Sequence, residues 1–105
     1  MVIIETSIFT RQVQQLLSDE DYRLLQLELI RHPEKGSIIP GSGGLRKIRW
    51  APRGHGKSGG VRTIYFWAVS DDQLFMLYIY PKNELENLSN EQLKLLRKII
   101  KEEFK

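Results

Sequence analysis

The sequence predicts a small α+β protein, with an antiparallel sheet that becomes mixed through its N-terminal strand and with helices packed on one face. Apolar residues recur at helical spacing near both ends of the chain. Between these regions, β-branched and aromatic residues form short consecutive runs that are typical of strands. Tight turns between the later runs favour antiparallel pairing. With 105 residues, the chain is expected to form one domain spanning positions 1–105.

The first strand and the first helix are expected in direct succession. Val2 to Glu5 is a short β-rich run. Thr6 or Ser7 can cap the helix that follows, because a hydroxyl oxygen accepts a hydrogen bond from a free amide of the first turn. The apolar face of this helix is expected to comprise Phe9, Val13, Leu16 and Leu17.

A second helix is expected after Ser18, which resembles a new N-cap. The three acids that follow it lie in the first turn, where the helix dipole favours negative charge. One face of this helix is apolar and comprises Tyr22, Leu25 and Leu29. The helix should end at His32-Pro33, because proline disfavours helical geometry in the residue before it.

Three strands and a last helix complete the predicted order β-α-α-β-β-β-α. The glycine-rich stretch from Lys35 to Gly44 is expected to be a surface loop. The strands are predicted at Leu45 to Trp50, Val61 to Val69 and Leu74 to Tyr80. Ser89 to Gln92 resembles a capping box for a helix that runs to about Phe104. Its inner stripe is predicted as Leu93, Leu96 and Ile100, and its outward residues as Lys94, Arg97, Lys98 and Lys101.

Positive charge is concentrated in the middle of the chain. From Lys35 to Ser70 there are seven basic residues and none of the thirteen acids, although the net charge is only +3. Strand alternation places Lys47 and Arg49 on the face opposite to Arg46 and its apolar neighbours. A basic face beside a glycine-rich loop is typical of proteins that bind a phosphate backbone.

Several other classes of function receive little support. The absence of cysteine excludes disulfides, and two histidines argue against a protein-only metal site, so neither metal nor cofactor is expected. No apolar run is long enough to span a membrane, and the N-terminus lacks a signal-peptide pattern, so a cytoplasmic protein is expected. The Gly54 to Gly60 loop lacks Walker A spacing and precedes a strand, which disfavours mononucleotide binding. No carboxylate pair or Ser-His-Asp arrangement indicates an ordinary hydrolase.

Each basic residue also has a simpler interpretation. Lys47 and Arg49 could be a solvated strand face that discourages aggregation. His55 could belong to an ordinary hairpin loop, and Arg62 could form an internal ion pair, for example with Glu84. The combination of strand cations, basic loop and Arg62 favours phosphate binding over these alternatives.

Several segments, in this order, resemble the RelE superfamily of bacterial toxins, and in particular its HigB-type members. They are Gly43 to Arg49, the basic loop, Val61 to Phe66 and Ile79 to Glu84, with His32 to Gly36 and Gly41 to Gly44 matching the HigB subgroup. The resemblance covers nearly the whole chain, which would then be a single toxin domain with a microbial-RNase-type fold. It implies a type II toxin that cleaves mRNA in the ribosomal A site, without metal, through attack of a 2′-hydroxyl on the adjacent phosphate. It also implies two partners, the ribosome and a cognate HigA-like antitoxin, with DNA contacted only through that antitoxin.

The resemblance also suggests the residues of the site. The catalytic residues expected are Arg62, Lys82, Lys57 and Arg49, and the RNA-binding residues are Lys47, Arg46, Arg53 and His55. Arg62 would stabilise the negative charge of the transition state. Pro81 replaces the family's glycine before Lys82, and the segment from Asn83 to Ser89 lacks the tyrosine or histidine that some members use as acid or base.

Three alternatives remain open at this point. A ParE-like toxin would share the fold and poison DNA gyrase, although such proteins usually lack clustered strand cations. A non-catalytic RNA-binding module would need only the basic face. In a structural adaptor, the acid-free stretch would have no functional meaning.

Overall fold

The fold is given by a computed structural model, which describes residues 1–52, 60–83 and 87–103. Its elements, in chain order, are β1 (Val2–Glu5), α1 (Ser7–Leu16), α2 (Asp19–Arg31), β2 (Ser37–Ile38), β3 (Arg46–Trp50), β4 (Val61–Ala68), β5 (Gln73–Pro81) and α3 (Asn90–Glu103). The expected helices and strands are all present. The stretch from Lys35 to Gly44, expected to be loop throughout, contains the additional short strand β2.

The five strands form one mixed sheet in the order β1-β5-β4-β3-β2. The pairs β5–β4, β4–β3 and β3–β2 are antiparallel, whereas β1 pairs with β5 in parallel. This topology confirms the α+β class and the mixed sheet with an N-terminal strand.

Side-chain caps start all three helices at the predicted positions. The Thr6 hydroxyl accepts from the Phe9 amide at 3.1 Å, and the Ser18 hydroxyl accepts from the Asp21 amide at 3.1 Å. At α3, the Gln92 amide donates to Ser89 Oγ at 3.2 Å, and the Ser89 amide donates to Gln92 Oε1 at 2.8 Å. This reciprocal pair is the predicted capping box.

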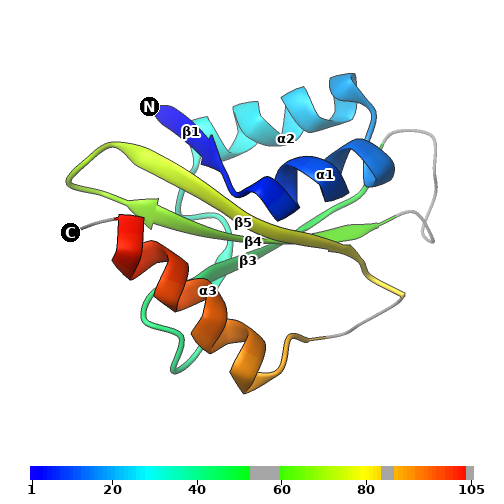
Figure 1. The fold of residues 1–105 in the computed structure, drawn as a ribbon. Coiled ribbons are helices and arrows are strands. Elements are labelled where there is room, and N and C mark those ends of the chain that lie inside the picture. Colours follow the sequence, from blue (N-terminus) through cyan, green and yellow to red (C-terminus); the bar gives the residue numbers. More distant parts are fainter. Residues whose placement is uncertain (53–59, 84–86, 104–105) are drawn as a thin grey trace.

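The two faces of the sheet support two apolar clusters. Residues of α1 and α2, including Phe9 and Leu25, pack with Tyr65 and Met76 of the sheet. The apolar stripe of α3 packs on the opposite face. In Figure 1, α1 and α2 accordingly lie above the sheet and α3 lies below it.

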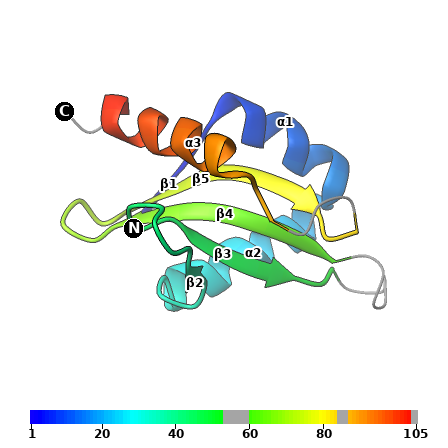
Figure 2. The ribbon, with the colours of Figure 1, turned by 90° about the horizontal axis from the view of Figure 1, so that it is seen from below.

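The position of α3 corrects the expectation that the helices pack on one face. Strand alternation directs Phe75 and Leu77 away from the α1–α2 layer, so both would be exposed without another cover. Leu93 and Leu96 of α3 provide that cover. Figure 2, seen from below, shows that α3 covers only part of this face, because no helix lies in front of β3.

None of the helices in the described part of the chain is both long and apolar enough to cross a membrane.

Candidate functional site

Three neighbouring strands bring the predicted basic residues to one end of the sheet. The register pairs Arg49 of β3 with Arg62 of β4, and Arg62 with Tyr80 of β5. Lys47 lies two residues before Arg49, and therefore on the same face of β3. Two like charges directly opposite each other destabilise a strand pair. A bound anion between Arg49 and Arg62 would offset this repulsion, so the pair favours an anion-binding site.

Arg62 is nearly buried, with 7% of its surface exposed, and it donates a hydrogen bond to the Tyr80 hydroxyl. Burial raises the pKa of Tyr80, and the adjacent Arg62 guanidinium offsets part of that rise. The Tyr80 hydroxyl is therefore protonated near neutral pH. A buried guanidinium held by a neutral phenol has few alternative orientations, which favours a fixed position at the site.

Tyr80 was not among the residues predicted from the sequence. The sequence placed it correctly in a strand ending at Pro81, but its role depends on the register with β4. The sequence analysis expected Lys82 at the same end of the sheet as Arg62, but the exact partner of Arg62 depends on a register that shifts between Ile64 and Tyr65.

A groove beside β3 carries further positive charge, and we call it the basic groove. It has a volume of about 620 Å³ and is lined by Lys35, Ser37, Ile38, Ile39, Pro40, Lys47, Ile48, Arg49 and Asn87. Lys47 Nζ donates to Asn87 Oδ1 at 2.7 Å, which holds the ammonium group near the start of α3. Lys35 forms an ion pair with Glu28 at 2.8 Å, and this contact lowers the pKa of the Glu28 carboxyl.

One wall of the basic groove is formed by Lys35 and Ser37 to Pro40. A buried tyrosine holds the segment that leads into this wall, from Pro33 to Gly36. The Tyr65 hydroxyl donates to the Pro33 carbonyl at 2.7 Å and accepts from the Gly36 amide at 2.9 Å. A Cβ at Gly36 would lie 2.7 Å from the Tyr65 ring, so the close approach requires glycine. The wall is therefore fixed by the core and not by the ligand.

Arg46 supports the same wall. Its Nη1 donates to the carbonyls of Glu34 at 3.0 Å and Gly36 at 2.8 Å. The structure thus places Arg46 on the α2 side of β3, away from Lys47 and Arg49, where it contacts backbone of this chain.

Lys82 lies just beyond β5, at the same end of the sheet as Arg62. Its amide donates to the Gly60 carbonyl at 3.0 Å, next to the pairing of Val61 with Pro81. The Lys82 side chain is exposed. Four residues that the sequence analysis considered, Arg53, His55, Lys57 and Glu84, lie outside the described residues.

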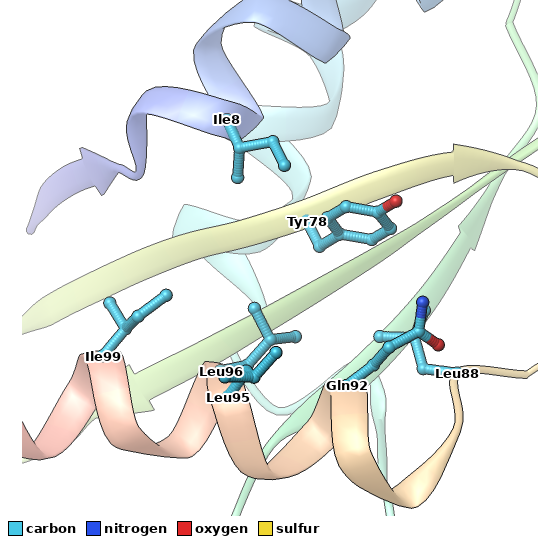
Figure 3. A pocket seen from close by; sticks show the side chains of 7 residues that line it. All are labelled: Ile8, Tyr78, Leu88, Gln92, Leu95, Leu96 and Ile99. Atoms are coloured by element: carbon cyan, nitrogen blue, oxygen red, sulfur yellow. The ribbon is translucent and has the colours of Figure 1, made fainter.

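A second hollow is apolar and lies between α1 and α3. It has a volume of about 310 Å³. Figure 3 shows its lining: Ile8 from α1, Tyr78 from β5, and Leu88, Gln92, Leu95, Leu96 and Ile99 from α3 and the residues before it. The ring of Tyr78 lies 5.9 Å from that of Tyr80, so this apolar hollow adjoins Tyr80, the buried partner of Arg62.

The arrangement is suited to holding a phosphodiester. Arg49, Lys47 and Arg62 present nitrogen donors on one face, and guanidinium groups bind phosphate oxygens in pairs. In the described ranges, no three acidic or histidine side chains are grouped as a metal ion would require.

Two comparisons relate the chain to known proteins. A family model described as "RelE toxin of RelE / RelB toxin-antitoxin system" matches residues 1–105. A solved structure of the Escherichia coli toxin RelE, an arginine-to-alanine double mutant in the free state, superimposes with a TM-score of 0.59. The match covers 81% of this chain and 86% of that chain, at 16% sequence identity, so it supports the fold alone. Neither comparison separates HigB-type toxins from others, and that finer resemblance stays a prediction.

Proposed function

The chain belongs to the RelE toxin family of toxin–antitoxin systems, and from this premise we propose that it is a ribosome-dependent endoribonuclease. It cleaves mRNA in the ribosomal A site and thereby stops translation. The observation that carries this proposal is the cross-strand pairing of Arg49 with Arg62, backed by Tyr80 and flanked by Lys47.

The proposed reaction is an internal transesterification of RNA. The 2′-hydroxyl of one nucleotide attacks the adjacent phosphorus and forms a new P–O bond, while the bond to the 5′-oxygen of the next nucleotide breaks. The products are a 2′,3′-cyclic phosphate and a 5′-hydroxyl, once a proton leaves the 2′-oxygen and another reaches the leaving oxygen. The phosphorus centre gains negative charge in the transition state, which cations held in advance stabilise most effectively.

We assign roles by position. Arg62, fixed by Tyr80, and Arg49, exposed opposite it, stabilise the charge on the phosphate oxygens. Lys82 acts at the same end of the sheet, and Lys47 binds the RNA backbone in the basic groove. Lys57 is the remaining proposed catalytic residue, with Arg53 and His55 as RNA contacts. No donor to the leaving oxygen is assigned within this chain, so the ribosome is a candidate source.

The family also implies an antitoxin partner. We propose that it is HigA-like and that any contact with DNA is made by the antitoxin. We further propose that residues 1–105 act as a single toxin domain.

The decisive test is cleavage of a defined mRNA by the purified protein in a reconstituted translation reaction. Primer extension would map new 5′ ends with ribosomes, and without ribosomes in EDTA. We expect cuts that are in phase with the codons and that occur only when ribosomes are present. Cuts without ribosomes would indicate a free RNase, and no cuts from a folded protein would overturn the proposal and favour gyrase poisoning or binding without chemistry.

A matched pair of variants tests the role of Arg62. Arg62→Ala is expected to lower the cleavage rate by about 10² to 10³ fold, the usual effect of removing one group that stabilises transition-state charge. Arg11→Ala removes the same charge from an exposed site on α1 and should cleave like the unmodified protein. A folded Arg62→Ala protein with the unmodified rate would contradict the role assigned to Arg62.

A further inference from the structure

A second basic surface lies on α3, outside the site described above. Four cations occur at positions that share one face of a helix, because they are spaced by three, four and seven residues. They are Lys94, Arg97, Lys98 and Lys101, and they alone line a hollow of about 260 Å³, which we call the α3 basic hollow.

Two described acids of α3 flank this surface, Glu91 three residues before Lys94 and Glu102 four residues after Lys98. The ion pairs among the described residues involve none of these four side chains. Like charges four residues apart destabilise a helix, and two such pairs occur here, Lys94 with Lys98 and Arg97 with Lys101. The helix dipole favours Lys101 in the last turn, whereas Lys94, Arg97 and Lys98 lie in the middle of the helix, where the dipole has little effect. This helix face therefore concentrates four cations that no ion pair among the described residues compensates.

The α3 basic hollow is joined to the basic groove by one ordered loop. Ile39 and Pro40 of this loop line the groove. Gly43 of the same loop lies so close to α3 that a Cβ there would be 2.5 Å from Nε of Arg97. Figure 1 shows the loop before β3 running beside α3.

Buried Ser42 holds this loop in shape. Its hydroxyl donates to the Ile39 carbonyl and accepts from the Leu45 amide at 3.0 Å, while the Ile39 amide donates to the Leu45 carbonyl at 2.8 Å. The loop is thus a fixed spacer between two basic surfaces.

We propose that the α3 basic hollow is a second binding site for the phosphodiester backbone of RNA. It anchors the protein at a distance from the reacting phosphate. This inference rests on the proposed function, because that function determines which RNA the protein meets. The RNA is either ribosomal RNA or the mRNA. An acidic segment of a protein partner is the competing occupant.

The test replaces three exposed lysines together, Lys94→Gln, Lys98→Gln and Lys101→Gln, and retains Arg97 because it packs against the loop. The control replaces Arg11, Arg23 and Arg31 by Gln. These are three exposed cations on α1 and α2 that also lack a described ion pair. Both variants lose the same charge, so only the location differs. Circular dichroism and urea denaturation would verify that both are folded.

Binding is measured over a range of salt in two arms, to ribosomes without mRNA and to a single-stranded mRNA oligonucleotide. Each phosphate contact contributes roughly 0.7 to 0.9 to the slope of log K against log salt, so the triple lysine variant should lose about 2. If the two proteins bind equally at about 1 M salt, this difference in slope makes the triple lysine variant bind about 100-fold more weakly than the unmodified protein at about 0.1 M salt. The arginine control should keep the slope of the unmodified protein.

The two arms identify the source of the phosphates. A loss with ribosomes alone assigns them to ribosomal RNA, and a loss with the oligonucleotide alone assigns them to the mRNA. A loss in both arms shows that the α3 basic hollow binds the backbone of either RNA. Equal slopes for the two variants in both arms would overturn the inference. So would a loss confined to antitoxin binding. These assays measure no chemistry, so absence of cleavage by the unmodified protein refutes the proposed function without deciding this site.

Discussion

Tyr80→Phe should lower the cleavage rate by removing the hydrogen bond that positions Arg62, while Arg62 itself is retained. Tyr80 is 3% exposed, so we expect it to act on RNA through Arg62, which donates a hydrogen bond to its hydroxyl, and not by direct contact. A hydrogen bond to a charged group is worth about 1.5–3 kcal/mol. If the bond serves wholly to hold Arg62 for the transition state, Tyr80→Phe should lower the cleavage rate by about 10- to 150-fold.

The assay is single-turnover cleavage of mRNA on stalled ribosomes, with the toxin varied to saturation. The rate at saturation should fall, while the toxin concentration for half the maximal rate should stay unchanged. The pH profile should keep its shape from about pH 6 to about pH 9, because the raised pKa keeps the Tyr80 phenol neutral throughout that range. A changed profile would instead indicate that Tyr80 transfers a proton.

Tyr78→Phe provides the matched control. It is the same chemical change, two residues away on the same strand, on a ring 5.9 Å from that of Tyr80. Its rate should lie within about twofold of the unmodified protein, because the change keeps the half-buried ring and leaves both Arg62 and Tyr80 unaltered. Equal rates for the two folded variants would refute the positioning role, as would a Tyr80→Phe defect that saturating toxin restores.

Two further predictions concern stability. Tyr65→Phe removes the hydroxyl that holds Pro33 and Gly36, so urea denaturation should show a loss of about 1–3 kcal/mol in unfolding free energy, and an unchanged value would contradict this role. Burial, reinforced by Glu5, raises the pKa of Tyr22 above its ordinary value of 10.0, so the unfolded chain ionises first and stability falls above about pH 10. Tyr22→Phe should make that alkaline loss shallower in the same assay, and an equally steep loss would exclude Tyr22 as its source.

The sequence predicted the elements well because their signals are local. The caps at Thr6 and Ser18 and the capping box at Ser89 depend on residues three positions apart, and the structure forms all three. The strand alternation that separated Lys47 from Arg46 is likewise local, and the structure places them on opposite sides of β3.

The features that were missed depend on contacts between distant elements. The apolar stripe of α3 was predicted, but periodicity carries no information about which face of the sheet it covers. Strand β2 has only two residues, and it forms through antiparallel pairing with the edge of β3. Residues distant in sequence, Tyr80 and Arg62, meet through cross-strand register, which an irregularity between Ile64 and Tyr65 also shifts. The site residues from Arg53 to Lys57 stay predictions.

The parallel pairing of β1 with β5 has a consequence for how the protein is made. Thr6 bonds to the backbone of Leu77, a contact between residues 71 positions apart. The first strand to be synthesised must therefore wait for one of the last before the sheet can close. Arg62 acquires Tyr80 at the same late stage. A partly synthesised chain thus lacks the finished site, and under the proposed function it would not yet cleave the mRNA from which it is being made.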